Sequence, residues 1–219
     1  MTKPDTAYRL LALFRYWNII HFFFPYKYAI NGNWNQVLPK LIPIFQQATT
    51  ESAYQLALYQ LVAHIQDSHG FIVSTDPTRC LRCDLDRLWL PFEVRLTADK
   101  AVITQLYNNS LTLPPWLTIG TVISHIDGET IGARVERLRP YQAASTSQAL
   151  LRDLSPLIAI GSQEAKLTLE LAGRDTTVTV LRHPYRKLGR NLSAYASDRY
   201  PVSSWLADRV GYVNIGKLS

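Results

Sequence analysis

Long apolar runs and targeting signals are missing from this sequence of 219 residues. A membrane-spanning helix needs about 20 consecutive apolar residues, and no run reaches that length. The most apolar stretch, residues 10–24, is interrupted by Arg15, Asn18 and His21. It also has no small-residue cleavage site, so neither a membrane span nor a signal peptide is expected in this sequence.

Charged residues are scarce as well: they make up 18% of the chain, against 47% hydrophobic residues. That balance indicates a globular protein with packed cores and excludes a largely disordered chain. The net charge of +6 is spread thinly, and no segment forms a basic block. Nucleic acid is therefore not an expected partner.

The chain has two cysteines, Cys80 and Cys83, in a C-x-x-C pattern. Two thiols are half of a structural zinc site, and no pair of histidines follows at ligand spacing. A redox pair would need a helix N-terminus and a thioredoxin-like context, which this stretch lacks. The favoured interpretation is a pair of surface-loop cysteines that can form a local disulfide.

Two kinds of reactive site are also missing. No nucleophile elbow of the G-x-S-x-G type occurs, and Ser219, the last residue, has no oxyanion loop after it. Four histidines form no ligand set with acidic neighbours: His21, His64, His125 and His183. No metal and no cofactor are therefore expected, and His21, which lies among aromatic residues, is interpreted as a core histidine.

What is present begins with helical patterns in residues 1–86. Apolar residues recur at helical spacing after a cap at Asp5, and Pro25 ends this first helix. The second pattern carries Pro39 and Pro43, so a bent or broken helix is expected. Aromatic residues around the end of the first helix are expected to form the core of the bundle and its loop: Trp17, Phe22, Phe23, Phe24, Tyr26 and Tyr28.

A third helical pattern starts at Thr49 or Thr50, either of which can cap it. It is expected to end at Gly70, because glycine accepts the left-handed conformation that follows a last turn. Its inner face consists of Tyr54, Leu58, Leu61, Val62 and Ile65. Three helices with one apolar stripe each predict a small bundle.

His69 follows this helical pattern in the sequence Asp67-Ser68-His69-Gly70. A histidine held just past a helix end is positioned by the scaffold and free to face a cleft, which suits a general base. The plainer interpretation is a helix C-cap residue that favours the helix dipole. Spacing alone favours the plainer interpretation, and only the surrounding sequence pattern shifts the balance toward a general base.

From Trp89 the period of the apolar residues changes to two, which is typical of strands. Residues 91–96 and 101–107 predict a strand pair, and residues 117–126 a further strand closed by the tight turn Asp127-Gly128. Two helices and a hairpin are expected next, at residues 131–139, 147–154, 165–171 and 176–181.

The C-terminal part of the sequence is polar between residues 187 and 208 and is interpreted as a linker. An apolar strand then begins at residues 209–216, with no later strand in the sequence to pair with.

Asp67-Ser68-His69, after the helical pattern and an aromatic-rich helix upstream, resembles the tricorn-type branch of the C-terminal-processing serine peptidases. The resemblance implies that His69 is the catalytic base and that Ser68 supports the site. It also implies a nucleophilic serine on a downstream domain, whose first strand corresponds to residues 209–216. The complete protein is then expected to be a serine-type peptidase. The present chain alone is expected to show no turnover and no labelling by serine-reactive phosphonates.

The order of elements after Trp89 resembles a PDZ domain of the kind that bacterial proteases carry. Residues 116–128 match the family's turn motif, with Thr121 where Asp is usual. The segment in the place of the carboxylate-binding loop and peptide-binding strand is Leu90-Pro91-Phe92-Glu93-Val94, which supplies the candidate peptide-binding residues. The glycines that expose backbone donors to a peptide carboxylate are missing there.

The predicted fold class is α+β, with a small helical bundle followed by a PDZ-like β-rich domain. The expected helical domain covers residues 1–86 and the PDZ-like domain residues 88–186. Residues 187–219 are expected to be a linker and the first strand of a peptidase domain.

Two functions stay open at this point. The first is the N-terminal and PDZ portion of a peptidase, whose substrate is a polypeptide. The second is a non-catalytic module in which the PDZ-like domain binds a peptide or a protein. A homo-oligomer is open under both. The family resemblance favours a periplasmic or secreted location.

Overall fold

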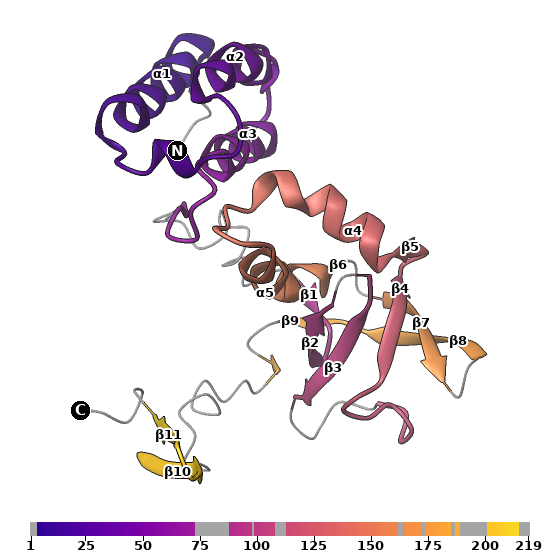
Figure 1. Cartoon of the computed structure of the whole chain (residues 1–219). Coiled ribbons are helices and arrows are strands. Elements are labelled where there is room, and N and C mark those ends of the chain that lie inside the picture. The colour runs from indigo at the N-terminus through magenta and orange to yellow at the C-terminus, as the bar shows by residue number, and fades with distance from the viewer. Residues whose placement is uncertain are drawn as a thin grey trace.

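The structure is a computed structural model that describes residues 4–72, 88–97, 99–107, 113–161, 164–171, 174–184, 187–188 and 201–214. Three helices near the N-terminus precede a unit of antiparallel strands and two further helices, so the expected α+β class is confirmed (Figure 1). Within these described residues, no helix is both long and apolar enough to cross a membrane.

The helical unit consists of α1 (Thr6–Phe23), η1 (Lys27–Ala29), η2 (Trp34–Gln36), α2 (Val37–Gln47) and α3 (Glu51–Ala63). The expected caps of the first and third helices are formed. The side chain of Asp5 accepts a hydrogen bond from the N–H of Tyr8, and that of Thr50 accepts one from the N–H of Ala53. α1 ends at Phe23, before the proline that was expected to end it.

α2 is one continuous helix, so the expected alternative of a break is wrong, while a bend stays a prediction. Pro39 lies in its first turn, where a backbone N–H has no partner within the helix. Pro43 lies inside the helix and removes one internal hydrogen bond. The helix persists because its apolar stripe is buried in the core, through Val37, Leu41 and Phe45.

Two polar contacts join the helices of this unit. The indole N–H of Trp17 donates to the carbonyl of Trp34 at 3.2 Å, and that of Trp34 donates to the carbonyl of Trp17 at 3.3 Å. The buried guanidinium of Arg9 donates to the carbonyls of Phe45 and Gln46, at 2.9 and 3.1 Å. A cation thus satisfies carbonyls that the end of α2 leaves without helical partners.

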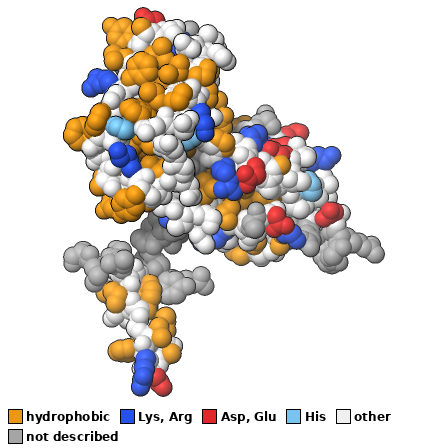
Figure 2. All heavy atoms as spheres, turned by 45° about the horizontal axis from the view of Figure 1, so that its top comes forward, with side chains coloured by type: hydrophobic (Ala, Val, Ile, Leu, Met, Phe, Trp, Pro, Cys, Tyr) orange, Lys and Arg blue, Asp and Glu red, His pale blue; other side chains and the backbone are white. Residues whose placement is uncertain are grey.

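Much of the aromatic cluster lies on the surface, where the sequence predicted core and loop. Trp17 and Phe24 pack against the buried core. Hydrophobic side chains also gather on the outside of the helical unit (Figure 2). The exposed members of the cluster are Phe22, Phe23, Tyr26 and Tyr28.

α3 ends at Ala63, well before Gly70, so the interpretation of Gly70 as its stop is wrong. The chain turns away at Gln66, which has a left-handed φ of 51°. The Gln66 side chain exchanges two hydrogen bonds with the backbone of Asn31, at 2.9 and 3.3 Å. Gly70 instead lets the backbone pass close to the side chain of Ile65, because a Cβ at residue 70 would lie 2.5 Å from Cδ1 of Ile65.

The second unit is built mainly from antiparallel strands. Its elements are β1 (Leu88–Trp89), β2 (Phe92–Leu96), β3 (Ala101–Leu106), β4 (Val122–Ile126), β5 (Glu129–Thr130), α4 (Ile131–Leu138), η4 (Arg139–Tyr141), α5 (Ser147–Ile158), β6 (Ile160–Gly161), β7 (Glu164–Leu171), β8 (Arg174–Leu181) and β9 (His183–Pro184). The main sheet has the order β2-β3-β4-β7-β8, with β5 paired to β4. A smaller sheet has the order β6-β1-β9.

The alternating sequence pattern predicted the pairing of β2 with β3 and of β7 with β8, and both pairs are present. β4 is shorter than expected, since a turn precedes it, closed by the bond from the N–H of Thr121 to the carbonyl of Thr118 at 3.1 Å. α5 runs to Ile158, past the expected end at residue 154, and contains Pro156. The tight turn at Asp127-Gly128 is confirmed by left-handed φ angles of 56° and 80°.

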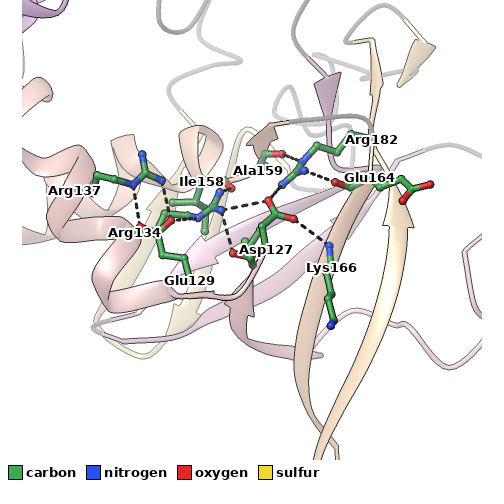
Figure 3. Close-up of polar contacts among 10 residues, drawn as sticks. Asp127, Glu129, Arg134, Arg137, Ile158, Ala159, Glu164, Lys166 and Arg182 are labelled. Carbon is green, nitrogen blue, oxygen red and sulfur yellow. Dashed lines mark hydrogen bonds and ion pairs between the residues drawn. The ribbon is translucent and has the colours of Figure 1, made fainter.

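A network of charges lies beneath the turn at Asp127 (Figure 3). Arg182, whose side chain is fully buried, donates to Oδ2 of Asp127 at 2.7 Å and to the carbonyl of Ala159 at 3.0 Å. Arg134 donates to the same carboxylate oxygen at 3.3 Å. Burial raises the pKa of Asp127, but hydrogen bonds from Arg182 and from the N–H of Lys166 outweigh it and hold that pKa below its ordinary value. The ionised carboxylate of Asp127 therefore pairs with two buried guanidinium groups, those of Arg134 and Arg182.

The helical unit and the β unit meet in the segment between η4 and α5. Ala143 in this segment is buried in the same hydrophobic cluster as Leu61, Val62 and Ile65. The β unit has its own, larger cluster. The first expected domain boundary falls within residues 73–87, outside the described residues, so the domain limits stay a prediction.

Near the C-terminus, β10 (Ser203–Ala207) and β11 (Val210–Val213) form an antiparallel hairpin. The sequence analysis placed residues 203–207 in a linker without a strand, which is wrong, and it looked only for a later partner of the terminal strand. The partner is β10, which precedes that strand. Two-stranded pairing with no other described strand leaves Trp205 and Leu206 exposed.

Replacement of Arg182 by Met should lower the free energy of unfolding by roughly 3 kcal/mol, because the Asp127 carboxylate and two backbone carbonyls lose their donor. Arg152→Met is the matched control, since Arg152 pairs with Asp153 at the surface and its loss should leave the melting temperature unchanged. Thermal unfolding of both variants measures the difference. Equal melting temperatures would show that the network does not stabilise the fold.

Candidate functional site

His69 lies in a four-residue turn that begins at Asp67. The N–H of Gly70 donates to the carbonyl of Asp67 at 2.8 Å and closes the turn. The N–H of His69 donates to Oδ1 of Asp67 at 3.0 Å. An aspartate in the first position of a turn commonly accepts a bond from the backbone two residues later, so the sequence itself favours this geometry. His69 is thus a turn residue, and the expected position at the end of a helix is wrong.

The imidazole of His69 is oriented by the same carboxylate. Its Nδ1 lies 2.9 Å from Oδ1 of Asp67, while the side chain is 94% exposed. A neutral imidazole that donates from Nδ1 carries its acceptor lone pair on Nε2. Within the described residues no contact is found for Nε2. The arrangement presents a proton acceptor to a group that approaches from outside.

The carboxylate of Asp67 is held in its ionised form. Hydrogen bonds from the backbone N–H of His69, and then from its ring, lower the pKa of Asp67 below its ordinary value. The negative charge of Asp67 also affects Tyr16. Burial, and then repulsion from Asp67, raises the pKa of Tyr16 to about 12. Asp67 can therefore stabilise a positive charge on the His69 ring.

Ser68, the other candidate residue of this site, bonds to the β unit. Its N–H donates to Oγ of Ser145 at 2.9 Å, and the N–H of Ser145 donates to Oγ of Ser68 at 3.0 Å. We call this reciprocal pair the serine clasp. It joins residues 77 positions apart, and it lies between the turn of His69 and the start of α5.

A cleft of about 480 Å³ lies beside the clasp, between α3 and the segment that precedes α5. Its lining includes His64 and Gln66 from the helical unit, and Ser145 and Thr146 from the β unit. Burial, and then the charge of Lys40, lowers the pKa of His64. His64 is therefore neutral over a wider pH range than a free histidine.

The five candidate peptide-binding residues lie in and next to β2. Four of them are buried: Leu90, Pro91, Phe92 and Val94. Glu93 is half-buried. The side chains of Leu90, Phe92 and Val94 belong to the hydrophobic core of the β unit, so a peptide could not contact them from the surface. Peptide binding here stays a prediction.

The backbone of β2 is partly occupied by α5. The N–H of Leu96 donates to Oγ of Ser155 at 3.0 Å, and this hydroxyl donates to the carbonyl of Leu151 at 2.7 Å. A peptide that extended the sheet at β2 would need such backbone donors for itself. This contact weakens the alternative function of a peptide-binding module.

The remaining candidates offer no second site. His21 is stacked on Trp17, with ring centroids 4.6 Å apart, which fits the expected packing among aromatic residues. Across the residues that the structure describes, no group of three His, Cys, Asp or Glu could hold a metal ion. Cys80 and Cys83 lie outside those residues, so their state stays a prediction.

Comparisons with known proteins support the fold. No family model matches the sequence, and no curated protein matches it. The crystal structure of mature CPAF, a chlamydial serine protease, is similar with a TM-score of 0.58 and 16% identity, over 81% of this chain and 34% of the CPAF chain. A crystal structure of a CPAF mutant gives a TM-score of 0.56 and 15% identity over the same shares. The chain therefore shares its fold with part of CPAF and spans about a third of the length of CPAF.

Sequence reasoning named His69 and Ser68 as candidates, but it assigned no role to Asp67 and did not identify Ser145. The signal for Asp67 was available, because an aspartate two residues before a polar turn residue favours a side-chain-to-backbone bond. Ser145 gave no comparable signal. It is one of several Ser and Thr residues in a polar stretch, and only the tertiary structure brings it to Ser68.

Peptides with a free C-terminal carboxylate should bind this chain weakly or not at all. Pro91 has no backbone donor, and the Leu96 N–H is already bonded to Ser155. The measurement is titration of a labelled peptide library, with each peptide compared with its amidated form. Micromolar binding that requires the free carboxylate would show that a carboxylate site exists.

Proposed function

We propose that this chain is the N-terminal and PDZ portion of a C-terminal-processing-type serine peptidase, and that His69 is the general base of peptide-bond hydrolysis. The substrate is a polypeptide. The nucleophilic serine and the donors that stabilise the oxyanion belong to a downstream domain of the complete protein. The observation that carries the proposal is the contact between Asp67 and the His69 ring in an exposed turn.

The chemistry follows from that contact. A serine hydroxyl is a weak nucleophile until a base within hydrogen-bond reach accepts its proton. Nε2 of His69 faces outward and can accept it, while Asp67 fixes the tautomer through Nδ1 and stabilises the imidazolium that forms. A positioned general base contributes roughly 10²–10⁴ to the rate.

The shared fold gives independent support. The likeness to CPAF extends over 81% of this chain, at 16% identity and a TM-score of 0.58. The chain spans about a third of CPAF, so a nucleophile elsewhere in a complete protein agrees with the missing G-x-S-x-G pattern. These observations favour a peptidase portion over a free-standing binding module.

In the complete protein, His69→Ala should abolish peptide cleavage and leave the melting temperature almost unchanged, because the side chain is exposed and no packed volume is lost. His21→Ala should do the opposite, since it removes the ring stacked on Trp17 and opens a gap among aromatic residues. Both variants are scored by peptide cleavage and by thermal unfolding.

The pair separates a catalytic histidine from a structural one. Cleavage at the wild-type rate by the His69 variant would overturn the proposal. A large fall in its melting temperature together with lost activity would also contradict it, because the loss would then follow from unfolding.

A further inference from the structure

We infer that Ser145, in the β unit, is a positioning residue for His69 and acts through the serine clasp. The inference rests on the proposed function of His69, but the clasp itself can be tested without any peptidase activity. Ser145 does not touch the reacting atoms. It fixes the backbone of Ser68, which lies between the two residues that form the Asp67–His69 pair.

The clasp holds the turn in both directions. Each serine donates its backbone N–H to the hydroxyl of the other, at 2.9 and 3.0 Å. Two antiparallel bonds between two residues restrain distance and rotation together, whereas one bond would leave rotation free. Because both groups of Ser68 face Ser145, the turn cannot rotate away without breaking both bonds.

The other side of the clasp is anchored in the β unit. Thr146, the next residue after Ser145, is the N-cap of α5, and its hydroxyl accepts a bond from the N–H of Ala149 at 3.1 Å. Two residues before Ser145, Ala143 is buried in the hydrophobic cluster of the helical unit. Ser145 is therefore held between a helix cap and a packed residue. Its two hydrogen bonds to Ser68 then restrain the backbone of Ser68.

The turn needs such a restraint because its own contacts are few. α3 has already ended at Ala63, so no helical hydrogen bond reaches residues 67–70. The nearest core contact is the close approach of Gly70 to Ile65. The side chain of His69 is almost fully exposed, so its packing cannot fix the ring. The clasp is the tertiary polar contact that the turn makes in the described structure.

The first test measures activity in the complete protein. Ser145→Ala removes the acceptor for the Ser68 N–H and should lower kcat about tenfold with KM unchanged, a smaller effect than the ~10² that a 1 Å misplacement can cost. Ser145→Thr keeps the hydroxyl and should retain most activity. Ser147→Ala is the matched control, because Ser147 is exposed nearby and its hydroxyl donates to the side chain of the exposed Gln148. It should behave as wild type.

The second test needs no activity and uses the 219-residue chain. Amide hydrogen exchange followed by NMR should be faster at Ser68 and His69 in Ser145→Ala, and unchanged in Ser147→Ala. Ser68→Ala and Ser145→Ala should each raise the exchange rates of the turn. In the double variant these increases should not add, because both changes break the same clasp.

The two tests separate this inference from the proposed function. Unchanged exchange at Ser68 and unchanged kcat in Ser145→Ala would overturn the inference, even if His69→Ala is inactive. Faster exchange in Ser145→Ala together with an active His69→Ala protein would keep the clasp and overturn the role of His69. Equal losses of kcat in Ser145→Ala and Ser145→Thr would also overturn the inference about Ser145, since the threonine retains the hydroxyl acceptor.

Discussion

Burial of Ala143 in the helical core is the constraint on which the rest of the arrangement depends. This residue belongs to the segment before α5, yet it packs with Leu61, Val62 and Ile65 of the helical unit. The contact fixes the segment against the end of α3 and so places Ser145 beside Ser68. A small apolar residue is thus buried at the junction where elements far apart in the sequence meet.

Local physics explains what the sequence predicted well. The caps at Asp5 and Thr50, and the strand pairs of the β unit, depend on residues close in the chain, and these were found. The errors occurred where tertiary contacts override local preference. Gly70 was interpreted as a helix stop, but in the structure it allows the backbone to pass close to the side chain of Ile65. The strand β10 was missed because its pattern is too polar and short to show a period.

The candidate site divides in the same way. Asp67 and His69 are two residues apart, so their contact follows from turn chemistry that a sequence can reveal. Ser68 pairs with a residue 77 positions away, and no local pattern encodes that distance. The proposed role of His69 rests on a family resemblance and stays a prediction, whereas the orientation of its ring is seen in the structure. The sequence thus named a candidate residue but not the contact that orients it.

The hairpin of β10 and β11 has a consequence for handling the protein. A two-stranded ribbon has two edges whose N–H and C=O groups are open to pairing, and isolated ribbons are only marginally stable in water. Here the ribbon also exposes Trp205, Leu206, Val210 and Val213. Such a surface acts as a template for another strand, so at high concentration this segment promotes aggregation of the chain unless another strand or surface covers it.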